Sequence, residues 1–119
     1  MRRAFLLIPI VLSPYIQASS LEDTKTYAKL VGTWHCVAPN GATSVAKYTA
    51  TGEYASDAGG SSKFFGKAAI KDGVLLTEFS SPGSSFVSNL SQFIEFQDIF
   101  GQVLKTSSVY GDAECKKIN

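Results

Sequence analysis

The stretch Leu-Val-Gly-Thr-Trp-His-Cys at residues 30–36 gathers the residues best suited to chemistry, because it holds the only tryptophan, the only histidine and one of the two cysteines. An imidazole beside a thiol can form a nucleophilic pair or contribute ligands to zinc. His35 and Cys36 are adjacent on a predicted strand, however, so their side chains point to opposite faces of the sheet. One histidine and two cysteines also fall short of the roughly four ligands of a structural zinc site. The sequence therefore predicts neither a metal site nor a catalytic residue here.

Other catalytic arrangements find little support. A serine nucleophile needs a histidine base, but the chain has only His35 and no Gly-x-Ser-x-Gly elbow. Glu78, Glu95 and Asp98 could approach one another across a sheet, although their spacing does not define an acid–base pair. The Gly-Gly-Ser-Ser run at 59–62 lacks the lysine spacing and the following helix of a phosphate-binding loop. We therefore expect a non-enzymatic protein without a cofactor.

Residues 1–20 have the layout of a secretory signal peptide. A basic start is followed by an apolar stretch and then by small residues, so cleavage is expected after Ala18 or Ser20. The apolar stretch contains prolines and is shorter than the roughly 20 residues that span a bilayer. The sequence predicts an exported protein, periplasmic or secreted, whose mature chain (21–119) forms a single domain without a membrane span.

The composition of the mature chain limits the kinds of partner that it can bind and the disulfides that it can form. It has nine basic and ten acidic side chains without a basic cluster, so nucleic-acid binding is not expected. Its two cysteines, Cys36 and Cys115, allow one intramolecular disulfide, as is common in exported domains. Two free thiols or a metal-bound pair are the alternatives.

The elements that must position these residues are mainly strands. Residues 21–30 carry an acidic first turn and apolar residues at helical spacing, which predicts a short helix or helical turn that ends before Gly32. After Gly32, turn motifs recur between short runs rich in Val, Thr, Tyr, Phe and Ile. This pattern predicts an all-β fold, a small antiparallel up-and-down barrel or meander of about 7–8 strands with a short N-terminal helical turn.

Two hairpins follow from local patterns. Residues 63–71 alternate lysine-rich and apolar faces, Asp72-Gly73 provides a two-residue turn, and 74–79 returns as the partner strand. A second hairpin is expected over 44–58 with its tip at Gly52. The segment 88–105 fits either a helix or strands, and its β-branched and aromatic content favours two strands with a turn near 98–101.

Aromatic side chains are the main resource for a core or a binding site. A domain of about 100 residues needs large side chains to bury enough apolar surface, which favours a filled barrel. In the alternative, a hollow barrel of about eight strands holds one small ligand. Tyr48, Tyr54 and Phe64 are the residues that we expect to contact an apolar ligand or a partner.

The order of these features resembles that of lipocalin-like proteins. The match consists of Gly-Thr-Trp at 32–34, Tyr-Thr-Ala-Thr-Gly-Glu-Tyr at 48–54 and Lys-Asp-Gly-Val-Leu-Leu-Thr at 71–77. The resemblance implies a β-barrel in which Gly32 and Trp34 are structural, with Trp34 at the closed end beside the helical turn. It also implies binding of a small ligand or a structural accessory role.

A second resemblance is to exported inhibitors of C-type lysozyme, which are small antiparallel barrels. An aromatic-x-Cys start, here Trp34-His35-Cys36, and a late Cys115 match that outline. The resemblance implies a disulfide between the two cysteines and a periplasmic inhibitor or immunity protein that binds a secreted protein. The family's inhibitory Ser-Gly-x-x-Tyr loop has a partial counterpart at 60–64, where glycine precedes serine and phenylalanine replaces tyrosine.

Overall fold

The structure, a computed structural model, describes residues 20–59 and 62–119. The predicted signal peptide therefore lies outside the described residues, apart from Ser20. The first two residues of the possible inhibitory loop, at 60–61, also lie outside them. Within the described ranges, no helix has the length and apolar character needed to cross a bilayer.

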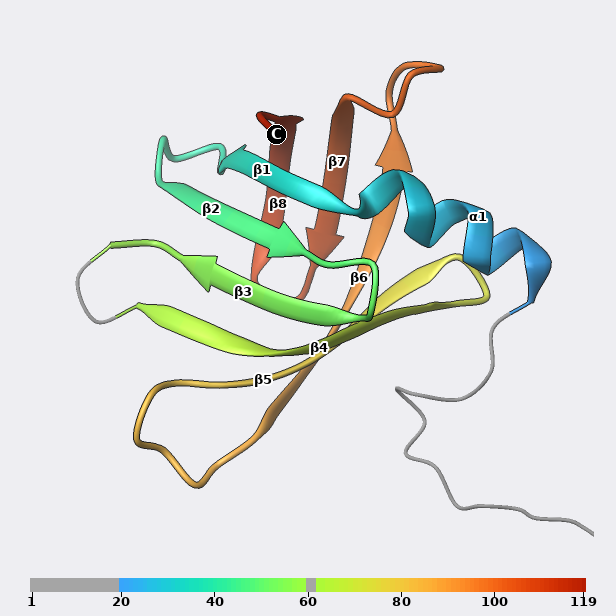
Figure 1. Cartoon of the computed structure of the whole chain (residues 1–119). Helices are drawn as coiled ribbons and strands as arrows, with labels where there is room; N and C mark the ends of the chain where they lie inside the picture. Colours follow the sequence, from blue (N-terminus) through green and yellow to red (C-terminus); the bar gives the residue numbers. More distant parts are fainter. Residues whose placement is uncertain (1–19, 60–61) are drawn as a thin grey trace, which may run out of the picture.

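Eight antiparallel strands form a closed barrel in sequence order, and the last strand pairs with the first (Figure 1). The all-β prediction is confirmed, and of the two alternatives the fold is the barrel. The segment 88–105 contributes two strands, as expected, and a turn separates them. The strands are β1 Gly32–Val37, β2 Thr43–Tyr48, β3 Glu53–Asp57, β4 Lys63–Lys71, β5 Val74–Ser80, β6 Ser88–Phe96, β7 Val103–Ser108 and β8 Gly111–Lys117.

The β4–β5 hairpin shows how alternation fixes the barrel wall. Asp72 and Gly73 both have positive φ, 52° and 80°, which is the backbone of the tight turn expected there. Ala68 and Ile70 of β4 and Leu75 of β5 are buried on the inner face. The lysines of β4 alternate with these residues and are exposed. This two-residue period places one side of each strand toward the interior.

The helix α1 (Leu21–Leu30) closes one end of the barrel (Figure 1). Ser20 caps it, because its hydroxyl oxygen accepts a hydrogen bond from the Asp23 amide at 3.1 Å. The Tyr27 hydroxyl donates to the carbonyl of Thr49 in the β2–β3 turn at 2.7 Å. Leu30, the last residue of the helix, is fully buried in the barrel core. Of the two predicted alternatives, residues 21–30 therefore form a helix, and it covers one end of the barrel.

Asp23 fastens the helix to the β4–β5 turn. Its carboxylate accepts hydrogen bonds from the backbone amides of Asp72, at 2.8 Å, and Gly73, at 3.0 Å. These donors stabilise the ionised form, so the Asp72 amide above all holds the pKa of Asp23 below its ordinary value, against the opposing effect of burial. A charged side chain at the start of the helix thus satisfies two turn amides.

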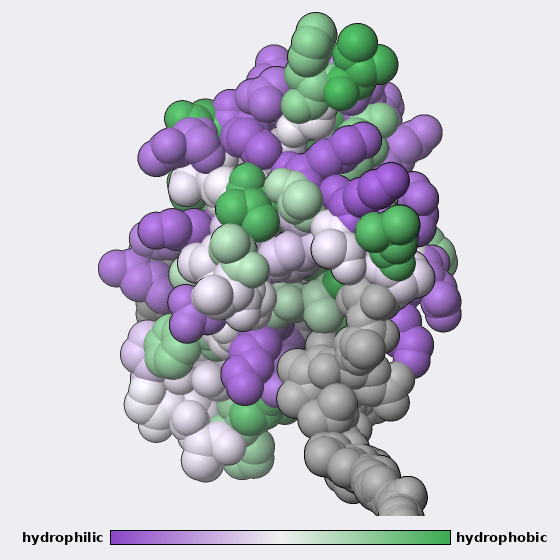
Figure 2. All heavy atoms as spheres, turned by 45° about the vertical axis from the view of Figure 1, so that its right-hand side comes forward, coloured by the Kyte–Doolittle hydropathy of each residue, from purple (hydrophilic) through white to green (hydrophobic). Residues whose placement is uncertain are grey.

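The interior is filled at the end that α1 covers. Leu30, Trp34, Ile70, Leu75 and Leu104 are between 0% and 2% exposed and pack into one cluster. Three turns meet the helix at this end, since Lys29 also packs against Gly101 between β6 and β7. The apolar Ile99 and Phe100 of that turn are exposed, and Figure 2 shows hydrophobic surface at the top of the face, where this turn lies.

The strand pairing that closes the barrel lies between β1 and β8. The register pairs Cys36 with Cys115, and the Thr33 amide donates to the carbonyl of Asn119 at 3.0 Å. Gly32 has a φ of +138°, and a Cβ there would lie 2.6 Å from the Asn119 carbonyl oxygen. Only glycine fits this position without strain, because other residues rarely adopt that backbone and the chain end packs against it.

Candidate functional site

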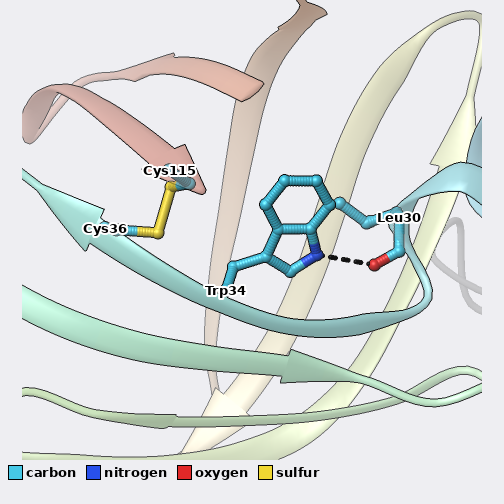
Figure 3. Close-up of a disulfide and its surroundings, with 4 residues drawn as sticks. All are labelled: Leu30, Trp34, Cys36 and Cys115. Atoms are coloured by element: carbon cyan, nitrogen blue, oxygen red, sulfur yellow. Dashed lines mark hydrogen bonds between the residues drawn. A yellow bond between two sulfur atoms is a disulfide. The ribbon is translucent and has the colours of Figure 1, made fainter. Parts of the chain in front are cut away.

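Trp34 and the disulfide stand side by side on the inner wall of the barrel (Figure 3). The disulfide joins Cys36 to Cys115 directly across the β1–β8 pair, with their Cα atoms 4.0 Å apart. Trp34 is fully buried, and its indole Nε1 donates to the carbonyl of Leu30 at 2.8 Å. The predicted disulfide is therefore present, and Trp34 lies at the closed end beside α1.

A cavity of about 530 Å³ occupies the other half of the barrel interior. Trp34 borders it from the closed end, while Ala58 and Tyr110 border it from the loops at the opposite end. The filled interior that the sequence favoured is therefore found only beside α1, and the barrel is hollow elsewhere. The lining residues are Trp34, Cys36, Ser44, Ala46, Tyr48, Tyr54, Ser56, Ala58, Phe64, Phe79, Ser88, Leu90, Gln92, Leu104, Thr106, Tyr110, Ala113 and Cys115.

One wall of the cavity is a continuous series of aromatic rings. The ring centroids of Tyr48 and Tyr54 are 5.3 Å apart, those of Tyr54 and Phe79 6.4 Å, and those of Phe79 and Phe64 5.3 Å. The contact between Tyr54 and Phe79 spans Gly66, which is paired with Tyr54 on one side and with Phe79 on the other. A Cβ on Gly66 would overlap the backbone carbonyl of Glu78. Gly66 therefore lets the strands approach closely beneath the rings.

Polar groups on the cavity wall are all uncharged. The Gln92 amide from β6 and the Thr106 hydroxyl from β7 lie on the wall, and the tyrosine hydroxyls of β2 and β3 add two more. Burial raises the pKa of Tyr48 and Tyr54 above the ordinary value, so both stay neutral in physiological solution. The lining therefore combines a mainly apolar surface with a few hydrogen-bonding groups and no ionised side chain.

The structure brings together all three residues that the sequence indicated for ligand or partner contact. Tyr48, Tyr54 and Phe64 line the cavity, and their contact with a ligand stays a prediction. Phe79 and Gln92 also line the cavity, and neither is among the contact residues expected from the sequence. The alternation of β5 places Phe79 on the same face as Leu75 and was a usable signal. The inward direction of Gln92 could not be predicted, because the sequence of segment 88–105 fits a helix as well as a strand.

The residues considered for catalysis are not brought together. His35 is exposed on the outer face of β1, whereas Cys36 points inward into the disulfide. Glu95 faces Lys105 across β6 and β7, and Asp98 accepts hydrogen bonds from backbone amides in its own turn. Among the residues that the structure describes, no group of three or more His, Cys, Asp or Glu side chains is placed to hold a metal ion.

A second hollow, of about 870 Å³, lies on the outside of the barrel over β6, β7 and β8. Its walls include the cross-strand row of Glu95, Lys105 and Glu114, together with the exposed ring of Phe93. Charged side chains on an outer sheet face are ordinarily solvated. The inner cavity is therefore the better candidate for a small molecule, because inward-facing side chains of the barrel strands line it and none of them is charged.

No protein-family model, curated protein or solved structure matches the chain with significance.

Proposed function

We propose that this protein is an exported, non-enzymatic, lipocalin-like barrel that binds a small, uncharged and mainly apolar ligand. The observation that carries the proposal is the cavity of about 530 Å³, lined by aromatic rings and by uncharged polar groups. Sites for small molecules commonly have volumes of about 300–1,000 Å³ and apolar walls with a few polar groups that orient the ligand. The cavity has each of these properties.

The lining also selects the chemistry of the ligand. Contact with the rings of Tyr54, Phe64 and Phe79 would remove apolar ligand surface from water, at about 25 cal/mol for each Å² buried. An ionised group would lose its hydration without finding an opposite charge, which is costly in an apolar site. Gln92 and Thr106 line the cavity and would offer hydrogen bonds to a hydroxyl or carbonyl group of the ligand. We therefore expect neutral ligands to bind and charged analogues to bind weakly.

Trp34 offers a direct measurement of occupancy, because it is the only tryptophan and it borders the cavity. The neutral probe N-phenyl-1-naphthylamine accepts energy from tryptophan and becomes fluorescent in apolar surroundings. We expect saturable quenching of Trp34 with a matching rise in probe emission. Absence of saturable binding at probe concentrations up to its solubility limit would refute the proposal.

A matched pair of variants locates the probe. Ala113→Phe adds a ring inside the cavity, whereas Ala55→Phe adds the same ring at an exposed position of β3. We expect Ala113→Phe to weaken probe binding at least tenfold and Ala55→Phe to leave it unchanged. Equal affinities for the two variants would place the probe outside the barrel.

The alternative function, a protein-binding inhibitor or immunity protein, has a specific observation in its favour. Phe86, Val87, Val109 and Tyr110 are between 60% and 89% exposed, in the two loops that flank β6 and β7 at the open end. Exposed apolar groups of this kind often mark sites of protein contact. The test is inhibition or stable binding of C-type lysozymes and secreted toxins by the purified protein, and failure across that panel would count against this alternative.

A further inference from the structure

The barrel has a gap in its hydrogen bonding beside the cavity. Strand β6 pairs with β5 from Ser88 to Phe93, but it pairs with β7 only from Phe93 to Phe96. Among the described residues, no strand therefore lies against the β7 side of 88–92, a segment that we call the free edge. The shorter β7–β8 hairpin turns back at Ser108–Gly111 and leaves this part of β6 uncovered.

The printed hydrogen bonds define which backbone groups the free edge presents. The Gln97 amide donates to the carbonyl of Val103 at 2.8 Å, so odd-numbered residues of β6 bond toward β7 in the alternating antiparallel pattern. Along the free edge, Asn89 and Ser91 therefore direct their N–H and C=O groups away from β5. Leu90 directs its own groups toward Thr77 of β5.

The free edge lacks the usual protection against another strand. Natural sheets guard exposed edges with lysine, proline or charged side chains, and the five residues Ser-Asn-Leu-Ser-Gln include none of these. Exposed apolar side chains stand near the edge instead. Phe86 and Val87 directly precede it, and Val109 and Tyr110 form the tip of the neighbouring hairpin.

We propose that the free edge binds an extended segment of a partner polypeptide as an added strand. The backbone of Asn89 and Ser91 would supply the hydrogen bonds, as in other cases of strand addition. Successive side chains of a strand point to opposite faces. Since Ser88, Leu90 and Gln92 line the cavity, every second side chain of the added segment would point into it.

The surroundings define the chemistry of that segment. Its inward side chains meet an uncharged wall that includes aromatic rings, which suits apolar residues and disfavours charged ones. Its ends lie near the exposed Phe86 and Tyr110, which suits further apolar contacts. The expected partner is thus an uncharged extended segment with apolar residues at alternate positions. This inference goes beyond the small-ligand proposal and does not depend on it.

The test uses amide hydrogen exchange of the full mature protein with a capped heptapeptide that alternates threonine with phenylalanine or valine. In the free protein, the amides of Asn89 and Ser91 should exchange rapidly and that of Leu90 slowly. Saturating peptide should slow exchange at Asn89 and Ser91 at least tenfold. The same peptide with a central proline, or with lysine in place of phenylalanine, should give no protection.

Two substitutions at one position provide the matched control. Ser91→Pro removes an N–H that β5 does not use, so the barrel should fold while the peptide binds at least tenfold more weakly. Ser91→Ala keeps the N–H and should bind as the wild type does. The proposal is overturned if millimolar peptide gives no protection or if Ser91→Pro binds like the wild type. It is also overturned if Asn89 and Ser91 are already protected in a concentration-dependent dimer, because a second copy would then occupy the edge.

Discussion

Removal of the disulfide by the double substitution Cys36→Ala/Cys115→Ala should greatly destabilise the barrel. The two cysteines are 79 residues apart in sequence and face each other across the strand pair that closes the barrel. The crosslink therefore ties together the ends of nearly the whole domain. Without it, the unfolded chain gains the freedom to separate β1 from β8.

The size of the effect follows from the length of the closed loop. In the chain-entropy model, a loop of 79 residues lowers the entropy of the unfolded chain by roughly 15 cal/mol/K, which is roughly 4.5 kcal/mol at 25 °C. Domains of this size are stable by only about 5–15 kcal/mol in total. A loss of this size corresponds to a decrease in Tm of roughly 20–35 °C.

Urea unfolding followed by Trp34 fluorescence and by circular dichroism measures this loss. The wild type in reducing agent is the matched control, because it keeps both sulfur atoms on the cavity wall while it lacks the crosslink. We expect the reduced wild type and the double variant to agree, both far below the oxidised protein. A loss of less than about 1 kcal/mol in both would show that hydrogen bonds between β1 and β8 close the barrel without the crosslink, and would refute the reasoning.

Three further predictions concern the attachment of the helix, the aromatic wall and the N-terminal cap of the helix. Asp23→Asn should lower the Tm at neutral pH but not in strong acid, because the lowered pKa of Asp23 gives a stabilisation that is present above about pH 4 and is lost as the pH falls through the folded pKa; parallel pH profiles for the two proteins would contradict this. Gly66→Ala should destabilise the barrel by about 2 kcal/mol or more in urea unfolding, because the added methyl group overlaps the Glu78 backbone; wild-type stability would contradict it. A chain that begins at Leu21 should be less stable by about 1 kcal/mol than a chain that begins at Ser19, because the shorter chain lacks the Ser20 cap of α1; equal stabilities of the two chains in urea unfolding would contradict this.

The strand pattern and the turns could be predicted because both depend on neighbouring residues. The alternation in 63–71 and the Asp72-Gly73 turn define the β4–β5 hairpin, since side-chain direction has a period of two and few residues adopt positive φ. The disulfide was also predictable, because two cysteines allow only one intramolecular pair and the N-terminal sequence predicts export to a compartment that permits disulfides. The helix over 21–30 followed from its acidic first turn and its apolar spacing.

The cavity could be predicted only in part. The sequence predicts large aromatic side chains on strands at Tyr48, Tyr54 and Phe64. Residue type alone, however, does not distinguish a ring packed in the core from a ring on a cavity wall. Trp34 and Leu104 fill one half of the barrel, while small residues such as Ser44, Ala46 and Ala113 leave the other half hollow. The difference depends on which side chains lie at the same height along the barrel axis. Predicting it would require the register of all the strands.

The sequence by itself determined most of the strands, the turns and the one cysteine pair available for a crosslink, because each depends on residue type and local spacing. Only the tertiary structure decided that the sheet closes, that α1 covers one end through Asp23 and Tyr27, and that the other end is hollow. It also decided that 88–92 of β6 extends past β7 and leaves backbone groups unpaired. These features arise from contacts between residues far apart in the chain, whose relative position is fixed only when the barrel closes.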